Sequence, residues 1–474
     1  MLMRRRGRTL VTSEYFTALR PISRHDSQVL TASATPLITH RPKHRPGFRA
    51  RRGLNWGVLG LMYTSYYLCR YNLPLANKSI SDEFHFSKSQ ITDVISLALL
   101  AYAIGQIVNG LLTDRLGGKK AMLIGAAGTI AMNVMFGVAS FWGLLWAFAL
   151  IRSVDGYMQS FGAPGFIKVN ASWFSQTERG TFAGVFGFMI NLGRLGINYF
   201  GSAILGGFVF LGMWHVSPLH WRWLFWIPAG VATIMAIVLA LVVKDTPEEA
   251  GFHDLYAGEA DHADTDAHGD IRTVFYQIVS NPVVWIIAGA YACTGAVRQS
   301  IDQWFPRYLQ EVQHVDLNSR AFQVTGFLIP FVASAGSLLS GAISDRMFQG
   351  RRAPVAMGIY FLEVAVILIA AQARSTPAIV ASFVAIAFTA NSTHSLLGPA
   401  AAMDIGGRKM AGFASGVIDS FQYFGASLAL KALGWLLDLS WHYYFYYMAP
   451  FGVIGGVLMW TIASRKSLKK GHKH

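Results

Sequence analysis

Long apolar runs recur through most of this 474-residue chain and restrict it to one class of fold. Each run is long enough for a helix to cross ~30 Å of hydrocarbon at about 1.5 Å per residue. The runs cover residues 54–77, 89–112, 120–139, 141–165, 181–211, 221–243, 282–310, 320–344, 353–372, 377–403, 411–437 and 441–463. Lipid offers backbone groups no hydrogen-bond partner, and closed barrels need an alternating pattern. The sequence therefore predicts an all-α membrane protein with twelve transmembrane helices.

The composition excludes several other classes. Only 14% of the residues are charged, whereas soluble proteins carry about 25%. The two cysteines, Cys69 and Cys293, lie in apolar runs and cannot build a disulfide scaffold or a cysteine metal site. No histidines stand at metal-ligand spacing, and no phosphate-binding G-x-x-x-x-G-K-[ST] loop occurs. We expect no cofactor, no metal, no ATP drive and no enzymatic activity.

The net charge of +15 resides at the two ends of the chain. Residues 1–52 hold twelve Lys/Arg and two acids, and residues 464–474 hold five basic residues and no acid. We therefore expect basic flanks that remain in the cytoplasm, and no nucleic-acid partner. Residues 1–52 are expected to be a disordered basic extension, although a transit peptide or a start codon assigned too far upstream has the same composition.

Loop charges predict the orientation. Even-numbered connections carry more Lys and Arg than odd-numbered ones, which places both termini in the cytoplasm, with the spans in the cell (inner) membrane. The longest connection, residues 244–281, has nine acids against Lys244 and Arg272 and reads as a cytoplasmic acidic linker. It contains no EF-hand pattern. The linker separates one six-helix bundle at 53–243 from another at 282–463, and the basic tail follows.

The two bundles repeat each other. Gly110-Leu-Leu-Thr-Asp114-Arg115 precedes a glycine-lysine turn, and Gly341-Ala-Ile-Ser-Asp345-Arg346 matches it at an offset of 231 residues. Gly193 is echoed by Gly425 at an offset of 232, and Arg70 by Arg298 at 228. A parallel repeat of this kind predicts two pseudo-symmetric bundles with the substrate site between them near the bilayer midplane.

These motifs carry a family resemblance. The Gly110–Lys120 loop resembles the cytoplasmic signature of the major facilitator superfamily. The stretches 66–72, 173–180 and 298–309 are similar to the organophosphate:phosphate antiporters, which include glycerol-3-phosphate and hexose-6-phosphate transporters. The resemblance covers nearly all of 54–463. It implies that Arg70 and Arg298 bind substrate and that tyrosines line the pocket, at Tyr63, Tyr67, Tyr102 and Tyr423. The family's second-helix lysine falls on Gln106, and Arg194 replaces a glycine of its fifth-helix signature.

Physical chemistry supports the two arginines independently. A central Arg costs at least ~2.5 kcal/mol on insertion scales, so it persists where an anion needs it, and its planar fork matches phosphate oxygens. Arg298 could instead pair with Asp302 one turn away. Arg194 is either a third anion contact or the partner of Asp419 or Asp155. Asp419 and Asp155 are possible proton sites. Glu363 and His394 receive no functional role.

The charged pairs at the cytoplasmic loops are expected to act as a gate. Asp114 with Arg115, and Asp345 with Arg346, lie at helix ends where ion pairs can exist in one conformation only. We expect them to latch the outward-facing state.

The leading hypothesis is a secondary transporter that exchanges a small organic phosphate for inorganic phosphate by alternating access, working as a monomer in the lipid bilayer. One alternative is a proton-coupled organic-anion symporter of the same fold. Another is a sugar-phosphate receptor that does not transport. The sequence does not choose the organic phosphate.

Overall fold

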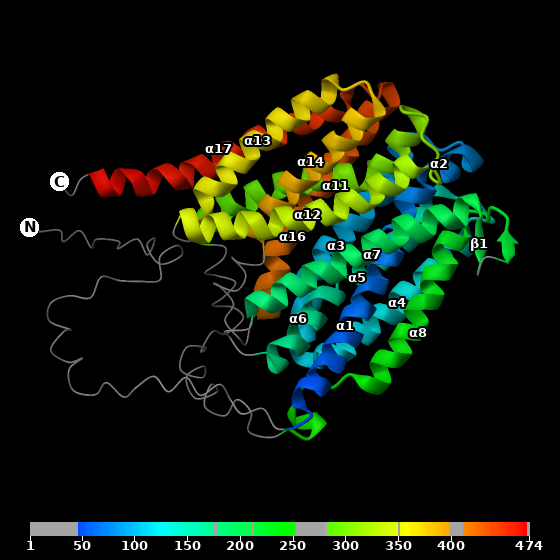
Figure 1. The fold of residues 1–474 in the computed structure, drawn as a ribbon, viewed down its shortest axis with the longest axis horizontal. Helices are drawn as coiled ribbons and strands as arrows, with labels where there is room; N and C mark the ends of the chain where they lie inside the picture. Colours follow the sequence, from blue (N-terminus) through cyan, green and yellow to red (C-terminus); the bar gives the residue numbers. More distant parts are fainter. Residues whose placement is uncertain are drawn as a thin grey trace, which may run out of the picture.

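The computed structural model describes residues 46–174, 179–210, 213–252, 280, 282–348, 351–398 and 411–471. The N-terminal half contains α1 (Phe48–Arg70), α2 (Asn72–Phe84), α3 (Lys88–Leu116), α4 (Gly118–Ala139), α5 (Leu145–Gln159), α6 (Gly162–Trp173), α7 (Arg179–Gly206) and α8 (Trp223–Val242). The C-terminal half contains α11 (Pro282–Glu311), α12 (Arg320–Met347), α13 (Arg352–Gln372), α14 (Thr376–Leu397), α16 (Ala411–Leu439) and α17 (Tyr443–Gly471). A small antiparallel hairpin, β1 (Phe208–Phe210) with β2 (Trp214–Val216), lies between α7 and α8. Figure 1 shows the two sets of helices side by side.

The expected twelve spans are present, and two of them are broken. The first expected span continues from α1 into α2 through a bend at Tyr71, which has φ −97° and ψ 12°. The fourth divides into α5 and α6 at Ser160 and Phe161. With each broken pair taken as one span, the described residues give six spans in each half. The fold predicted from the sequence is therefore confirmed.

The spans differ in polarity according to what they face. Among the described residues, seven helices are long and apolar enough to cross a membrane: α3, α4, α8, α12, α13, α14 and α17. Helices α1, α11 and α16 fall outside this set, and they carry Arg70, Arg298 and Asp419 respectively. Each of the three packs against other helices of the bundle, so its polar side chains need not face lipid.

Close glycine contacts show the internal repeat in three dimensions. A Cβ on Gly193 would lie 2.6 Å from the carbonyl oxygen of Thr64, and one on Gly425 would lie 2.5 Å from that of Ala292. The two glycines are 232 residues apart and the two carbonyls 228, which are the offsets found in the sequence. Helix α7 therefore packs on α1 as α16 packs on α11. Each pair of helices approaches so closely at its glycine that no side chain would fit there.

Several hydrogen bonds join the two halves at one end of the molecule. The Asp438 carboxylate accepts from the backbone N–H groups of Lys88 (2.7 Å) and Ser89 (3.2 Å), so it caps α3 from the opposite half. Arg307 donates to Asn77 (2.8 Å) and Ser81 (2.7 Å). The two sets of helices diverge toward the opposite end, where α17 finishes (Figure 1). The described conformation is thus closed at the end that holds the 84–88 and 311–320 connections.

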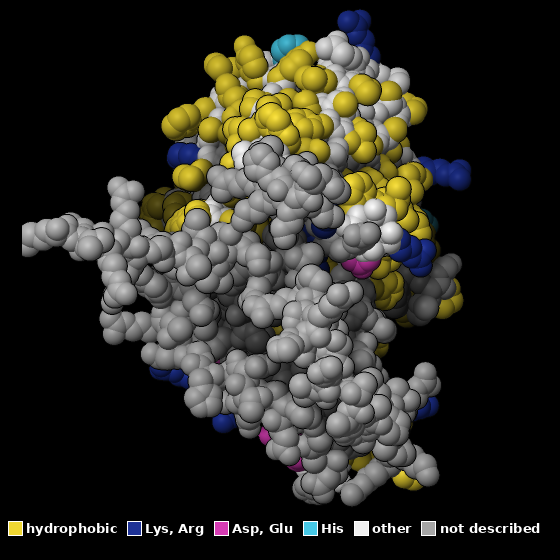
Figure 2. Space-filling view, turned by 90° about the vertical axis from the view of Figure 1, so that its left-hand side faces the viewer, with side chains coloured by type: hydrophobic (Ala, Val, Ile, Leu, Met, Phe, Trp, Pro, Cys, Tyr) yellow, Lys and Arg dark blue, Asp and Glu magenta, His cyan; other side chains and the backbone are white. Residues whose placement is uncertain are grey.

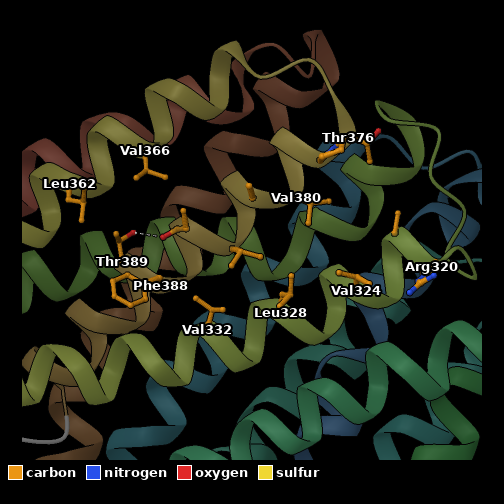
Figure 3. A pocket seen from close by; sticks show the side chains of 15 residues that line it. Arg320, Val324, Leu328, Val332, Leu362, Val366, Thr376, Val380, Phe388 and Thr389 are labelled. Atoms are coloured by element: carbon orange, nitrogen blue, oxygen red, sulfur yellow. Dashed lines mark hydrogen bonds between the residues drawn. The ribbon is translucent and has the colours of Figure 1, made fainter.

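The outer surface suits a lipid environment. Large hydrophobic side chains such as Phe331, Leu338 and Ile369 are exposed on α12 and α13, and Figure 2 shows such side chains spread over the C-terminal half. An open groove of about 980 Å³ runs between α12, α13 and α14, lined by aliphatic residues with Arg320 and Thr376 at one end (Figure 3). Its apolar lining fits contact with acyl chains and gives a polar substrate no partners.

The boundaries of the halves shift slightly from those expected. Helix α1 begins at Phe48, before the expected boundary at residue 53, and the Phe48 ring stacks on Trp173 at 5.9 Å. The start of the expected linker also packs on this half, because Lys244 and Asn55 exchange hydrogen bonds of 2.8 and 3.2 Å. Residues 1–45, 253–279 and 472–474 lie outside the described residues, so most of the acidic linker and of the basic extension does too.

Candidate functional site

Arg70 occupies the last position of α1, where the first span breaks. The bend at Tyr71 leaves backbone carbonyls without their usual helical partners. The Arg152 guanidinium of α5 donates to the carbonyl oxygens of Cys69 (3.1 Å) and Arg70 (2.5 Å). Asp155 in turn accepts from Arg152 at 2.7 Å. This buried pair therefore holds the broken end of α1, and with it the backbone of Arg70, in place.

The Arg70 side chain lies in an aromatic and amide environment, and no acid among the described residues forms an ion pair with it. Its Nε donates to Gln159 Oε1 at 2.7 Å, and its guanidinium lies over the rings of Tyr67 (4.8 Å) and Tyr102 (4.4 Å). The Nη2 atom is buried without a hydrogen-bond partner. A buried, unpaired guanidinium nitrogen is costly, and an anion at this position would satisfy it.

Arg298 mirrors this arrangement from α11. With the Gln422 amide turned so that its oxygen faces donors and its nitrogen faces acceptors, Arg298 Nη1 donates to that oxygen at 2.8 Å, and Nε is buried with no hydrogen-bond partner among the described residues. Asp302, one turn further along, lies 3.9 Å from Nε, at the limit of an ion pair. Both sequence-predicted arginines are therefore buried, and each retains an unsatisfied donor.

A chain of direct contacts connects the two arginines across the halves. Tyr102 lies under Arg70, and its ring is 4.4 Å from the ring of Tyr423 on α16. Gln106 donates to the Tyr102 hydroxyl (2.7 Å) and to Asp419 (3.4 Å). Gln422 donates to Asp419 (3.2 Å) and accepts from Arg298. We call this set the central cluster: Arg70, Tyr102, Gln106, Arg298, Asp419, Gln422 and Tyr423.

Two tyrosines of α1, Tyr63 and Tyr67, pack beside the central cluster. Tyr67 contacts Arg70 directly, whereas Tyr63 packs among the rings of Tyr66, Tyr67 and Phe166. The cavity beside Arg70 measures only about 30 Å³, which is room for about one water molecule. Side chains or helices must therefore move before this cavity can hold a phosphate ester.

Arg194 forms an ion pair that the sequence did not suggest. Its guanidinium contacts the carboxylate of Asp302, not Asp419 or Asp155, and it lies 5.2 Å over the Tyr71 ring. The Tyr71 hydroxyl donates to the same carboxylate at 3.1 Å. The pair crosses from α7 to α11 and so joins the two halves beside the central cluster. One guanidinium nitrogen of Arg194, Nη1, is buried without a partner.

The two candidate proton sites differ in their surroundings. Asp155 is neutralised by Arg152 and accepts two further bonds from Gln159, at 2.9 and 3.0 Å. Asp419 has only neutral hydrogen-bond partners among the described residues. The Tyr291 hydroxyl donates to it at 3.1 Å, and His394 Nδ1 contacts that hydroxyl at 2.7 Å.

The expected gating residues do not meet one another in this conformation. Asp114 accepts from Lys168 of the same half at 3.0 Å. Arg115, Asp345 and Arg346 are exposed and form no ion pair within the part of the chain that the structure describes. A latch formed by these residues in the outward-facing state therefore remains a prediction.

Several residues of this region carried no sequence signal of their role. Tyr71, Gln159, Tyr291, His394 and Gln422 are uncharged or isolated polar residues inside apolar runs, which usually indicates packing. Glu363, which received no functional role from the sequence, is fully buried; one carboxylate oxygen has no partner among the described residues and the other accepts from Thr389 at 3.3 Å. The described residues hold no group of His, Cys, Asp and Glu able to bind a metal ion.

Comparison with known proteins identifies the class. Residues 59–430 match the model of the Major Facilitator Superfamily. The chain therefore belongs to the major facilitator superfamily, and it is a multi-pass membrane transport protein and not an enzyme. Its curated relatives include a glycerol-3-phosphate transporter and a probable hexose phosphate transport protein, which is consistent with the resemblance that the motifs implied.

Three of the similar proteins differ in their described roles: two are transport proteins and one is a membrane sensor protein. The glycerol-3-phosphate transporter of Bacillus subtilis is 27% identical, with 80% of this chain and 85% of the relative covered. The membrane sensor protein UhpC of Salmonella typhimurium is also 27% identical, with 92% and 97% covered. A probable hexose phosphate transport protein of Chlamydia trachomatis is 27% identical as well, with 87% and 91% covered.

A solved structure supports the fold. A bacterial homolog of the human lysosomal transporter Spinster, in an inward-facing and unoccupied conformation, matches with a TM-score of 0.70. The match covers 88% of this chain and 98% of that chain at 17% identity, and it bears on the fold alone.

Proposed function

We propose that this protein exchanges a small organic phosphate for inorganic phosphate by alternating access. The observation that carries the proposal is the pair of buried guanidinium groups, Arg70 and Arg298, one from each half, each with an unpartnered nitrogen. Phosphate oxygens accept from guanidinium forks, so a single phosphate between them would satisfy both. The names of the relatives support a phosphate ester of the glycerol-3-phosphate or hexose-phosphate type as the organic substrate.

The same pair accounts for obligatory exchange. An empty site leaves the two guanidinium groups of the central cluster with no phosphate to neutralise them, and their repulsion opposes closure of the halves. A bound phosphate removes the repulsion and draws both halves toward it, because it interacts more strongly with the closed arrangement. The carrier therefore reorients with phosphate bound and stalls without it. One chain supplies both halves, so we propose a functional monomer with both termini in the cytoplasm.

Counterflow tests this proposal. The protein is reconstituted into vesicles loaded with inorganic phosphate, and uptake of labelled glycerol 3-phosphate and glucose 6-phosphate is followed. We expect uptake only in loaded vesicles. Uptake of equal rate and extent into phosphate-free vesicles would contradict exchange.

A receptor that binds without transporting is the second candidate, because a membrane sensor protein stands among relatives of equal identity. The same vesicles separate the two. Saturable binding of glucose 6-phosphate with no flux in loaded vesicles would favour the receptor.

A further inference from the structure

The central cluster carries an uneven charge. It contains two guanidinium groups, Arg70 and Arg298, and one carboxylate, Asp419. Arg194 and Asp302 beside it form a closed ion pair and add no net charge. With Asp419 ionised the cluster is +1, which balances a monoanion. A phosphate ester at neutral pH is mainly a dianion, because its second ionisation lies near pH 6.

Asp419 has the contacts of a group that can hold a proton. Its oxygens meet the amide of Gln106, the amide of Gln422 and the hydroxyl of Tyr291, and none of these is charged. A carboxylate buried among neutral partners is poorly stabilised as an anion. A dianionic phosphate bound between the arginines would repel it further.

We propose that Asp419 takes up one proton when a dianionic phosphate ester binds, and that the protein therefore carries a proton together with the ester. This rests on the proposed function. Protonation makes the cluster +2, which balances the dianion. The proton forms an O–H bond on the Asp419 carboxylate and comes from water, so no other group changes its oxidation state.

Two hydrogen bonds connect Asp419 through Tyr291 with His394 on α14. Because the Tyr291 hydroxyl donates to Asp419, it can accept from His394 Nδ1 in the tautomer that carries a proton on this nitrogen. His394 is half-buried near the C-terminal end of α14. A proton accepted by His394 can pass through the Tyr291 hydroxyl to the carboxylate.

Few groups near Asp419 could take up the proton in its place. Helix α6, which also packs on α16, contributes Lys168, whose charge is neutralised by Asp114. Among the residues that the structure describes, the remaining titratable or charged groups around Asp419 are Arg70 on α1, Tyr102 on α3, Tyr291 and Arg298 on α11, His394 on α14 and Tyr423 on α16. The tyrosines stay neutral and the arginines stay charged near pH 8. Asp419 and His394 remain as the groups able to titrate.

The test is proton uptake on binding. Calorimetric titration of the full chain with glycerol 3-phosphate at pH 8, in two buffers that differ in ionisation enthalpy, gives the number of protons bound per ester. We expect about one proton for the wild type, since the ester itself is already a dianion at this pH. We expect no uptake for Asp419→Asn, with ester binding retained.

Two further variants complete the test. Gln106→Lys places a fixed cation beside Asp419, so it should bind the ester without proton uptake, and it decides the matter if Asp419→Asn fails to fold. Glu363→Gln removes another buried carboxyl outside the cluster and should match the wild type. Wild-type binding without proton uptake, or unchanged uptake in Asp419→Asn, overturns the proposal. A wild type that binds no phosphate ester overturns the proposed function instead.

Discussion

The buried carboxylate of Asp302 on α11 forms an ion pair with Arg194 on α7, in the other half of the molecule. Both side chains are at most 5% exposed, and Arg298 lies 3.9 Å from the same carboxylate. One acid therefore connects the contact that closes the halves with an arginine proposed to bind phosphate. A phosphate that binds Arg298 would change the charge around Asp302. Because Asp302 also pairs with Arg194 of the other half, binding of phosphate would affect the contact between the halves.

Loss of this pair should open the closed end. Asp302→Asn leaves Arg194 buried without its counter-ion and weakens the contact between the halves. Asp82 and Asp316 are both exposed at that end, so each can be replaced by a cysteine that carries a spin label. Double electron–electron resonance should then give a longer distance between the two labels in Asp302→Asn than in the protein without this substitution. The native Cys69 and Cys293 are buried and should not label readily.

A second pair across the halves provides the control. Asp93 and Lys431 also form an ion pair, but both are substantially exposed, at 33% and 45%. Exposed pairs contribute little. Asp93→Asn should leave the label distance near that of the wild type, and equal opening in both variants would refute a special role for Asp302.

Stability should reveal the same pair through a double-mutant cycle. Removing one partner of a buried ion pair costs about 3–5 kcal/mol, because it strands a charge, whereas removing both is much less harmful. Arg194→Gln and Asp302→Asn should each lower the melting temperature, and the double variant should recover part of the loss. Strictly additive losses would show that the two side chains do not interact.

Arg152 should act as a positioning residue. It binds the carbonyls at the broken end of α1, and its removal should misplace Arg70 without removing it. Arg152→Gln should raise the KM for phosphate exchange and leave the pH profile unchanged. The same substitution at the exposed Arg320 is the control and should match the wild type. An unchanged KM in Arg152→Gln would contradict the positioning role.

The glycine contacts of the repeat make a packing prediction. Gly425→Ala inserts a methyl group 2.5 Å from the Ala292 carbonyl and should destabilise the protein by about 1–3 kcal/mol. Gly358→Ala, on α13 with open space around it, should be neutral or mildly stabilising because alanine favours the helix. Thermal unfolding of the two variants measures this, and equal melting temperatures would contradict the close packing.

The sequence predicted what depends on local composition and on repetition. Apolar run lengths predicted the spans, and the matched positions of Arg70 and Arg298 indicated the candidate site, because charges are rare in such runs. The partner of Arg194 was not predictable, since it lies 108 residues away on another helix. The bend at Tyr71 and the hydrogen bonds from His394 through Tyr291 to Asp419 were not predicted either. A single polar residue in an apolar run gives the same sequence signal whether it packs in the core or binds a ligand.

Phosphate exchange in reconstituted vesicles tests the central claim most directly, with Arg70→Lys and Arg298→Lys compared to the wild type. Lysine keeps the positive charge but loses the planar fork, so one phosphate could no longer be shared between the two halves. We predict that either substitution abolishes exchange, while Arg320→Lys on the outer face leaves it intact. Near-normal exchange in either Arg70→Lys or Arg298→Lys would contradict a phosphate held jointly by both arginines.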